Sequence, residues 1–187
     1  MTTANPTTST TGSESCNAMT GVGAGDDFNA RLKSNGKSDP QSLKTRATAA
    51  ISVVRPFLAR AQLNTMAAGC RGEEKEYFMQ LFIDLSTRIT AMPKTYEQDG
   101  LMMQAVVHLH YFLGGSDWYV LEKDVDGGVR QAFGYVILNG DEDCSELGYL
   151  SIEEITRHGA ELNLHFQPCT LTTLLARRAQ NDVPAGN

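Results

Sequence analysis

The residues with the clearest potential for chemistry are two histidines, His108 and His110, in a run of apolar and aromatic residues. On a β-strand, residues two apart project to the same face, so both imidazoles would point to one side and could bind a metal ion together. Asp117 or Glu122 from a neighbouring strand could add a carboxylate ligand. A third ligand at a diagnostic spacing is missing, and the alternative is that both histidines are ordinary hydrogen-bonded strand residues. We therefore expect no metal and no cofactor, and we keep a small metal- or ligand-binding enzyme domain as an alternative.

Acidic residues are concentrated in the second half of the chain. The net charge is -6, but residues 1–94 contain 11 basic and 8 acidic side chains, whereas residues 95–187 contain 5 and 14. Such an imbalance bears on partners and association rates rather than on fold. The densest acidic group consists of Asp141, Glu142, Asp143 and Glu146. We interpret it either as a solubilising loop or as an array of carboxylates that meets a basic groove on another molecule.

Four further acids would enlarge this array if they lay on the same side of the protein: Glu97, Asp99, Asp124 and Asp126. Aligned carboxylates of this kind would imitate the charge spacing of a nucleic-acid backbone. Whether the acidic surface mimics nucleic acid is left open by the sequence.

One expected strand combines aromatic and acidic residues. Trp118 and Tyr119 must point to opposite faces of a sheet, so one packs in the core and the other lies nearer to solvent. Burial statistics favour Trp118 as the core residue, whereas the sequence does not decide between a core role and a recognition role for Tyr119. The residues that we expect to bind a partner are Tyr119, Glu122, Asp124, Asp141, Glu142, Asp143 and Glu146.

A basic segment precedes the acidic half. Residues 31–60 contain seven basic side chains and one acidic side chain. They could contact phosphates, but no DNA-reading motif accompanies them and part of the segment lies in a polar tail. A solvated helix face with its linker is the better explanation of the pattern. A nucleic-acid-binding accessory factor is therefore an alternative, and direct nucleic-acid binding is not our expectation.

Several functional classes leave no trace in the sequence. There is no phosphate-binding loop, no nucleophile elbow and no dinucleotide fingerprint, so we predict no catalytic residue. The four cysteines stand far apart and are expected to be reduced thiols: Cys16, Cys70, Cys144 and Cys169. A signal peptide and a long apolar run are also missing. These features favour a cytoplasmic protein without a membrane segment.

Two helices are expected before the strands. Apolar residues at three- and four-residue steps predict a helix over residues 42–63, which Pro56 should kink or divide. A second stripe predicts a helix from Tyr77 to Ile89 that ends before Pro93. Its first turn would hold three acids favoured there by the helix dipole, Glu73, Glu74 and Glu76.

The strands follow in a meander separated by Gly, Asn and Asp. We expect strands over residues 106–113, 118–123, 131–138, 147–150 and 162–166, with the acidic run DEDCSE at 141–146 as a loop. Ser151 and Glu154 fit a capping box that begins a short helix, which Gly159 should close. Thr170 can cap a C-terminal helix.

This order of elements predicts an α+β fold: two N-terminal helices, a small antiparallel sheet of about five strands, a short inserted helix and a C-terminal helix. The expected organisation is a disordered tail over residues 1–40, a helical segment over 41–92, a sheet domain over 93–180 and a disordered C-terminus over 181–187.

Four segments carry a resemblance to a known family: MPKTYEQDG, HLHYFLGGSDWYVLEKD, QAFGYVILN and ELGYLSIEEI. From Met92 to about Leu175, just under half of the chain, the sequence resembles a family of small uncharacterised domains carried by bacterial plasmids, integrative elements and phages. Its pattern is a W-Y-x-x-E strand, an aromatic-Gly strand, and E-L-G-Y followed by S-hydrophobic-x-E. The matching residues are Trp118, Tyr119 and Glu122, Phe133 and Gly134, Glu146, Leu147, Gly148 and Tyr149, and Ser151 and Glu154.

Some relatives in that family are reported as anti-CRISPR proteins or occur beside antirestriction genes. The resemblance therefore implies a counter-defence or accessory role for a mobile element, and it transfers no catalytic residue. Our expectation is a non-enzymatic protein that binds a host defence protein, such as a CRISPR or restriction component, through its acidic surface. The oligomeric state is left open by the sequence.

Overall fold

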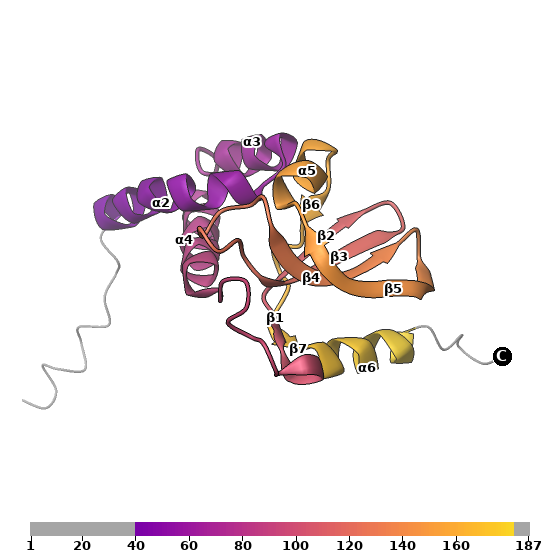
Figure 1. Ribbon diagram of the computed structural model, residues 1–187. Helices are drawn as coiled ribbons and strands as arrows, with labels where there is room; N and C mark the ends of the chain where they lie inside the picture. Colours follow the sequence, from indigo (N-terminus) through magenta and orange to yellow (C-terminus); the bar gives the residue numbers. More distant parts are fainter. Residues whose placement is uncertain (1–39, 182–187) are drawn as a thin grey trace, which may run out of the picture. The chain divides into compact units, whose positions relative to one another are not determined.

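The computed structural model describes residues 40–181 (Figure 1). It contains both helices and an antiparallel sheet of five strands, which confirms the predicted α+β class. The predicted N-terminal tail lies outside the described residues except for Pro40, where the first described helix begins. The predicted C-terminal tail also lies outside them except for Asn181.

The helices and strands alternate in blocks along the chain. The helices are α2 (Pro40–Val54), α3 (Arg60–Gly69), α4 (Lys75–Ala91), α5 (Ile152–Arg157) and α6 (Leu171–Asn181), with the 3₁₀ turns η1 (Arg55–Phe57) and η2 (Met102–Gln104). The strands are β1 (Val106–Val107), β2 (Leu109–Leu113), β3 (Ser116–Glu122), β4 (Ala132–Leu138), β5 (Asp141–Leu150), β6 (Glu161–Leu162) and β7 (Cys169–Thr170).

Proline determines where the helices end. The predicted first helix is divided, as expected, because α2 ends at Val54 and Pro56 lies in η1, before α3 begins. The predicted second helix corresponds to α4, which ends two residues before Pro93. The prediction for its first turn was only partly correct, since Glu73 and Glu74 precede the helix and Glu76 alone lies in that turn.

The main sheet has the strand order β5-β4-β3-β2-β6, and β1 pairs with β7 in a separate two-stranded sheet. Every pair of neighbouring strands is antiparallel. Helices α2, α3 and α4 lie on one side of the main sheet and α6 on the other (Figure 1). The two faces therefore bury separate hydrophobic clusters.

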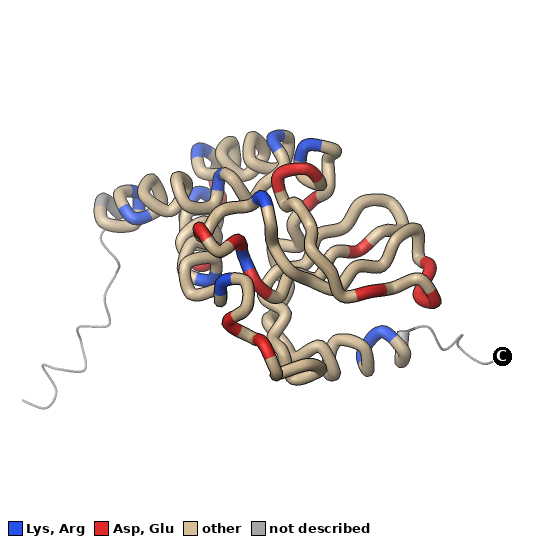
Figure 2. Tube along the Cα trace, viewed as in Figure 1, with Lys and Arg blue, Asp and Glu red and all other residues tan. Residues whose placement is uncertain are grey.

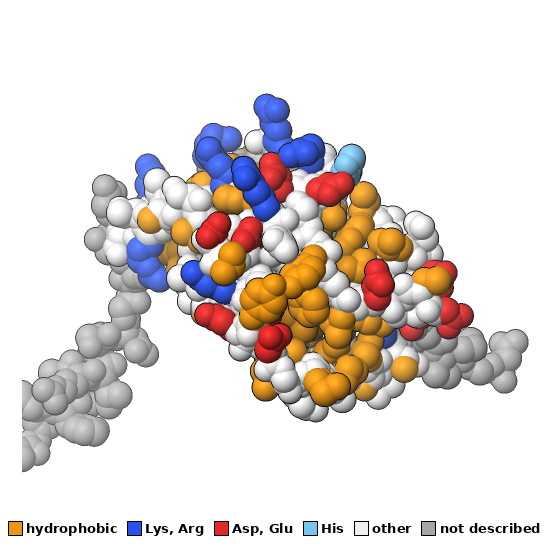
Figure 3. All heavy atoms as spheres, viewed as in Figure 1, with side chains coloured by type: hydrophobic (Ala, Val, Ile, Leu, Met, Phe, Trp, Pro, Cys, Tyr) orange, Lys and Arg blue, Asp and Glu red, His pale blue; other side chains and the backbone are white. Residues whose placement is uncertain are grey.

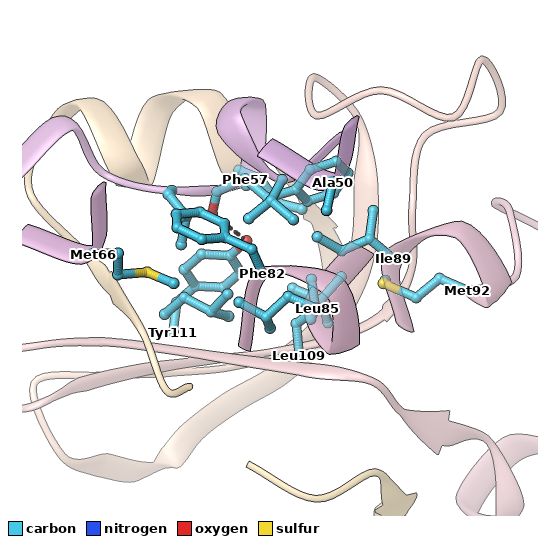
Figure 4. Packing of buried hydrophobic residues seen from close by; sticks show 14 of the residues in the cluster. Ala50, Phe57, Met66, Phe82, Leu85, Ile89, Met92, Leu109 and Tyr111 are labelled. Carbon is cyan, nitrogen blue, oxygen red and sulfur yellow. Dashed lines mark hydrogen bonds between the residues drawn. The ribbon is translucent and has the colours of Figure 1, made fainter. Parts of the chain in front are cut away.

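The first cluster joins the helical segment to the sheet. Phe82 and Leu85 of α4 pack with Phe57, Leu109 and Tyr111, as Figure 4 shows. The ring of Tyr111 is fully buried and its hydroxyl donates a hydrogen bond of 2.9 Å to the backbone carbonyl of Phe57. Burial raises the pKa of this hydroxyl, so it remains protonated and serves as a donor.

The second cluster lies between the other face of the sheet and α6. Leu171 and Leu174 of α6 pack against Tyr119, Leu121 and Ile137. The predicted N-caps Ser151 and Thr170 and the predicted helix end at Gly159 are confirmed. Ser151 Oγ accepts the backbone N–H of Glu154, Gly159 has φ +98°, and Thr170 Oγ1 accepts the backbone N–H of Thr173.

Three strand predictions were wrong. The acidic run is not a separate loop, because β5 begins at Asp141, which pairs with Leu138, and Glu146 pairs with Val136. Residues 142–145 between these pairs form an irregularity in the ladder. The two turn residues Asn139 and Gly140 have φ of +54° and +73°, which matches a tight two-residue hairpin turn between the paired residues Leu138 and Asp141. Charged side chains are tolerated there because β5 is an edge strand.

The predicted last strand over residues 162–166 is also too long, since β6 ends at Leu162. Beyond it, Asn163 Oδ1 accepts the backbone N–H of His165, and such local side-chain bonds compete with a strand ladder. The predicted strand over residues 106–113 is interrupted at His108. Val107 packs in the second cluster whereas Leu109 packs in the first, so the regular alternation of side chains breaks between them.

None of the helices within residues 40–181 is long and apolar enough to cross a membrane.

Candidate functional site

The main candidate site is the acidic hairpin, which we define as Asp141, Glu142, Asp143 and Glu146 at the beginning of β5. All four residues are exposed. They follow the two-residue turn between β4 and β5, and β5 forms one edge of the main sheet. Figure 2 shows acidic residues gathered at this end of the hairpin. The hairpin turn therefore brings the densest acidic group of the sequence to an exposed sheet edge.

The four carboxylates of the acidic hairpin differ in what they contact. Asp141 Oδ1 accepts the backbone N–H groups of Asp143 and Cys144, at 3.1 and 3.3 Å. Glu142 Oε1 accepts hydrogen bonds of 3.0 and 2.9 Å from Arg178 on α6. The carboxylates of Asp141, Asp143 and Glu146 form no ion pair with any residue in the part of the chain that the structure describes. Three exposed negative charges are therefore left uncompensated on the hairpin.

Arg178 connects the hairpin to the interior. Its Nη1 donates to Asp117 Oδ2 at 3.2 Å and to the hydroxyl of Tyr119 at 2.8 Å. Asp117 Oδ1 in turn lies 2.7 Å from His110 Nε2, and the His110 ring stacks on Tyr119 with centroids 4.5 Å apart. This polar network links α6 to β2, β3 and β5, so it fixes the position of the hairpin relative to the second cluster.

Electrostatics stabilise the network in its charged form. Burial alone would raise the pKa of Asp117, but the hydrogen bond and charge of His110, together with Arg178, bring it below the ordinary value. Burial alone would lower the pKa of Arg178, but its bonds to Glu142 and Tyr119 and the charge of Asp117 raise it. The interactions thus outweigh desolvation at both groups.

Replacing Asp117 with asparagine tests this network through pH. Because the folded pKa of Asp117 is below its ordinary value, its contribution to the free energy of unfolding is present at neutral pH and is lost as pH falls through the folded pKa. The parent protein should therefore lose more stability than the Asp117→Asn variant between about pH 5 and pH 2. Urea denaturation across this range measures the difference, and parallel pH profiles for the two proteins would contradict the expectation.

The other three predicted partner-binding residues do not join the acidic hairpin. Tyr119 and Glu122 are each only 3% exposed, so the structure places both in the interior. Asp124 is half-buried and its carboxylate accepts the backbone N–H groups of Asp126 and Gln131, which organises the loop between β3 and β4. We therefore restrict the candidate surface to the four hairpin acids. The expectation that Trp118 is the core residue of the pair was wrong, because Trp118 is only half-buried against the first cluster whereas Tyr119 is buried in the second.

Two acids considered as part of a wider array, Asp124 and Asp126, do not extend the acidic hairpin. Asp124 and Asp126 lie in the loop at the opposite end of β4 from the hairpin turn. The seven residues of β4 separate the two groups, a length of roughly 20 Å at the usual rise per strand residue. Asp124 and Asp126 therefore form a group separate from the acidic hairpin.

The two histidines considered as metal ligands lie in different surroundings. His110 contacts Asp117 and Tyr119, whereas burial, Arg88 and Lys123 lower the pKa of His108. Cations near His108 would oppose the binding of a metal ion there. The break at His108 removes the common face that the prediction required, and no three His, Cys, Asp or Glu side chains within residues 40–181 are close enough to hold a metal ion.

The basic segment is only partly described, since residues 31–39 lie outside the described part. The other four basic residues of the segment are exposed on or beside α2 and at the start of α3, namely Lys44, Arg46, Arg55 and Arg60. Figure 3 shows Lys and Arg side chains spread over the helical side of the molecule.

Of the four cysteines, Cys70, Cys144 and Cys169 are free thiols, and Cys16 lies outside the described residues.

Sequence reasoning missed the role of Arg178. It contacts residues 36 and 61 positions away along the chain, and its only local signal is a basic residue in the last turns of a helix.

Comparisons of the chain with protein-family models, with curated proteins and with solved structures find no match.

Proposed function

We propose that this chain is a non-enzymatic binding protein whose acidic hairpin docks against a basic surface of another protein. The observation that carries the proposal is the set of three uncompensated carboxylates, Asp141, Asp143 and Glu146, on an edge hairpin. The hairpin is held in place by Arg178, so its charges are presented by a positioned element. Fixed charge of one sign raises the rate of encounter with a partner of the opposite sign.

The proposed biological role is counter-defence for a phage or another mobile element in the bacterial cytoplasm. Support for this part comes from the resemblance of the W-Y-x-x-E, aromatic-Gly and E-L-G-Y segments to domains carried by such elements. A basic groove that normally binds nucleic acid, as in a CRISPR or restriction component, is the class of surface that clustered carboxylates would complement. The proposal thus joins a charge pattern to a family resemblance.

The test reverses the charge of the hairpin without breaking its anchor. A triple variant with Asp141→Lys, Asp143→Lys and Glu146→Lys leaves Glu142 and its bonds to Arg178 in place. The matched control replaces three exposed acids near the start of α4, Glu73, Glu74 and Glu76, with lysine, which changes the net charge equally. Exposed charges contribute only about 0 to 1 kcal/mol each to stability, so both variants should fold.

Each protein is then expressed in bacteria that carry a CRISPR or restriction system and are challenged with phage or plasmid DNA. The parent and the control should protect the incoming DNA, whereas the hairpin variant should protect at least about tenfold less well, equivalent to about 1.4 kcal/mol of binding. Equal protection by the hairpin variant and the parent would return the acids to a solubilising role. Failure of the parent to protect against any such system would remove the counter-defence assignment.

A further inference from the structure

A pocket of about 160 Å³ lies on the sheet face that also carries the second cluster, beyond the area that α6 covers. Its lining includes Asp99, Met102, Glu122, Phe133 and Leu147. An engineered cavity of about 150 Å³ binds benzene, so the space is sufficient for the end of one amino-acid side chain. Figure 3 shows hydrophobic side chains gathered on one face, with acidic side chains at the margin.

One aromatic ring, that of Phe133, lines this pocket, and the ring of Tyr149 lies beside it. The rings of Phe133 and Tyr149 meet edge to face, with centroids 5.5 Å apart, and the Tyr149 hydroxyl donates to the Tyr96 hydroxyl at 3.0 Å. Tyr149 is 53% exposed and Tyr96 is 62% exposed. Paired aromatic rings that remain open to solvent are available to a ligand, and their faces attract cations.

Glu122 supplies a buried negative charge to the same pocket. Its two carboxylate oxygens accept the backbone N–H groups of Tyr96 and Gln98. It forms no ion pair with residues 40–181, and the ammonium of the adjacent Lys123 bonds instead to the carbonyls of Ile89 and Thr90 on α4. A carboxylate can accept about four hydrogen bonds, so Glu122 retains capacity for a cationic donor.

The backbone around the pocket is strained. Three non-glycine residues within residues 40–181 have positive φ. One of them, Met102 at +47°, lines this pocket, and another, Tyr96 at +78°, is bonded through its backbone N–H to the lining residue Glu122. Both side chains are exposed, Met102 by 78%. Such strain persists only where surrounding contacts impose it, and it is concentrated at ligand clamps and other functional sites. At Tyr96, the hydrogen bond from its backbone N–H to Glu122 is one such contact.

We propose that this aromatic and acidic pocket binds the arginine side chain of a protein partner. A guanidinium stacks on aromatic faces and donates paired hydrogen bonds to carboxylates, so it matches Phe133, Tyr149 and Glu122 better than an ammonium does. Asp99 adds a second, exposed carboxylate to the lining. We infer a positively charged occupant because the carboxylate of Glu122 has no ion pair within residues 40–181, and a planar occupant because planar groups stack on aromatic rings.

The inference deepens the proposed function, on which it rests for the occupant being part of a protein. Leu147 and Tyr149 lie on β5, the strand that begins with the acidic hairpin. A basic partner that follows β5 would therefore meet carboxylates at one end and the pocket at the other. The acidic hairpin would raise the rate at which the partner associates, and the pocket would hold one arginine of the bound partner.

The test uses small probes that do not depend on a partner. N-acetyl-arginine methylamide, its lysine counterpart and its uncharged citrulline counterpart are titrated separately into the full chain and followed by backbone amide NMR. The arginine probe should shift the signals of Gln98 and Phe133 with millimolar affinity, and the citrulline probe should bind at least about threefold more weakly because it lacks the charge. Equal binding of arginine and citrulline, or no shift at the pocket, would overturn the proposal.

Variants separate the pocket from other contacts. Tyr149→Ala and Asp99→Asn alter exposed residues and should each weaken the arginine probe by about twofold or more, whereas Tyr77→Ala removes a similarly exposed tyrosine on α4 and should not. Glu122→Gln should also weaken binding of the arginine probe. If the Glu122→Gln protein does not fold, the variants Tyr149→Ala and Asp99→Asn test the proposal by themselves. Equal binding by the parent, Tyr149→Ala and Asp99→Asn would place the probe elsewhere.

The hairpin variant distinguishes failure of the pocket from failure of the proposed function. The triple lysine variant of the acidic hairpin should still bind the arginine probe, because Asp141, Asp143 and Glu146 do not line the pocket. Loss of DNA protection in that variant together with no probe binding by the parent would leave the proposed function standing and reject the pocket. Probe binding by the parent without any protection activity would reject the proposed function alone.

Discussion

The Tyr111→Ala variant is expected to lose about 3 to 5 kcal/mol of the free energy of unfolding. Tyr111 is fully buried in the first cluster, where its ring packs between the sheet and the helices and its hydroxyl bonds to Phe57. Removing the ring leaves a cavity and an unpaired buried carbonyl, and the two costs add. Urea denaturation monitored by circular dichroism measures the change.

Two further variants identify the origin of this loss. Phe112→Ala changes the next residue of β2, whose side chain is 40% exposed. Apart from the lower strand propensity of alanine, this change should lower the free energy of unfolding by less than about 1 kcal/mol. Tyr111→Phe keeps the ring and removes only the hydroxyl, so it should cost about 1 to 3 kcal/mol. A Tyr111→Ala protein as stable as the Phe112→Ala protein would show that the helical segment and the sheet do not depend on a shared core.

The Gly134→Ala variant is expected to lose about 1 to 3 kcal/mol or more. A Cβ atom at Gly134 would lie 2.5 Å from the backbone carbonyl oxygen of Tyr119 and 2.9 Å from Leu150 Cδ2. Because β3 has an irregular register between Val120 and Glu122 beside this position, the two backbones approach closely and cannot separate without disturbing the ladder. Thermal and urea denaturation both report the loss.

Gly148 provides the matched control for this prediction. It is the cross-strand partner of Gly134, and nothing lies within 4 Å of a Cβ atom added there. Gly148→Ala should therefore change stability by less than about 1 kcal/mol and can be stabilising, since alanine restricts the unfolded chain. Equal losses in the two variants would mean that both glycines matter for strand conformation rather than for the approach of β3 to β4.

Local signals in the sequence predicted most of the elements. The apolar stripes of α2 and α4, the interruption at Pro56 and the caps at Ser151 and Thr170 depend on residues within one or two turns of each other. Such interactions can be inferred without knowing the fold. The positions of the turns at Gly114 and Gly140 follow for the same reason, since both glycines have positive φ.

The errors arose where tertiary structure overrides local composition. The charged residues 141–146 suggest a loop, yet the two-residue turn and the exposed edge allow them to continue β5. The break at His108 has no marker in a run of strand-forming residues, because it occurs where the chain passes from the sheet with β7 to the sheet with β3. Alternation alone cannot reveal such a change of partner.

The candidate site was predictable in its charge but not in its connections. Composition located the acids at 141–146, whereas the anchor Arg178 and the interior positions of Tyr119 and Glu122 depend on contacts between distant segments. The pocket beside Tyr149 was missed for the same reason, since its lining comes from four separate stretches of the chain. A strained Tyr96 leaves no signal in the sequence.

The most direct test of the proposed function is the association rate constant with a purified partner, identified by capture with the parent protein and measured at two salt concentrations. For the parent and for the control with lysine at Glu73, Glu74 and Glu76, association should be fast at low salt and should slow by about tenfold or more as the screening length falls from about 30 Å to about 8 Å. The variant with lysine at Asp141, Asp143 and Glu146 should associate slowly at both concentrations. Equal rate constants and equal salt dependence for the parent and this hairpin variant would contradict the proposal that the acidic hairpin meets the partner.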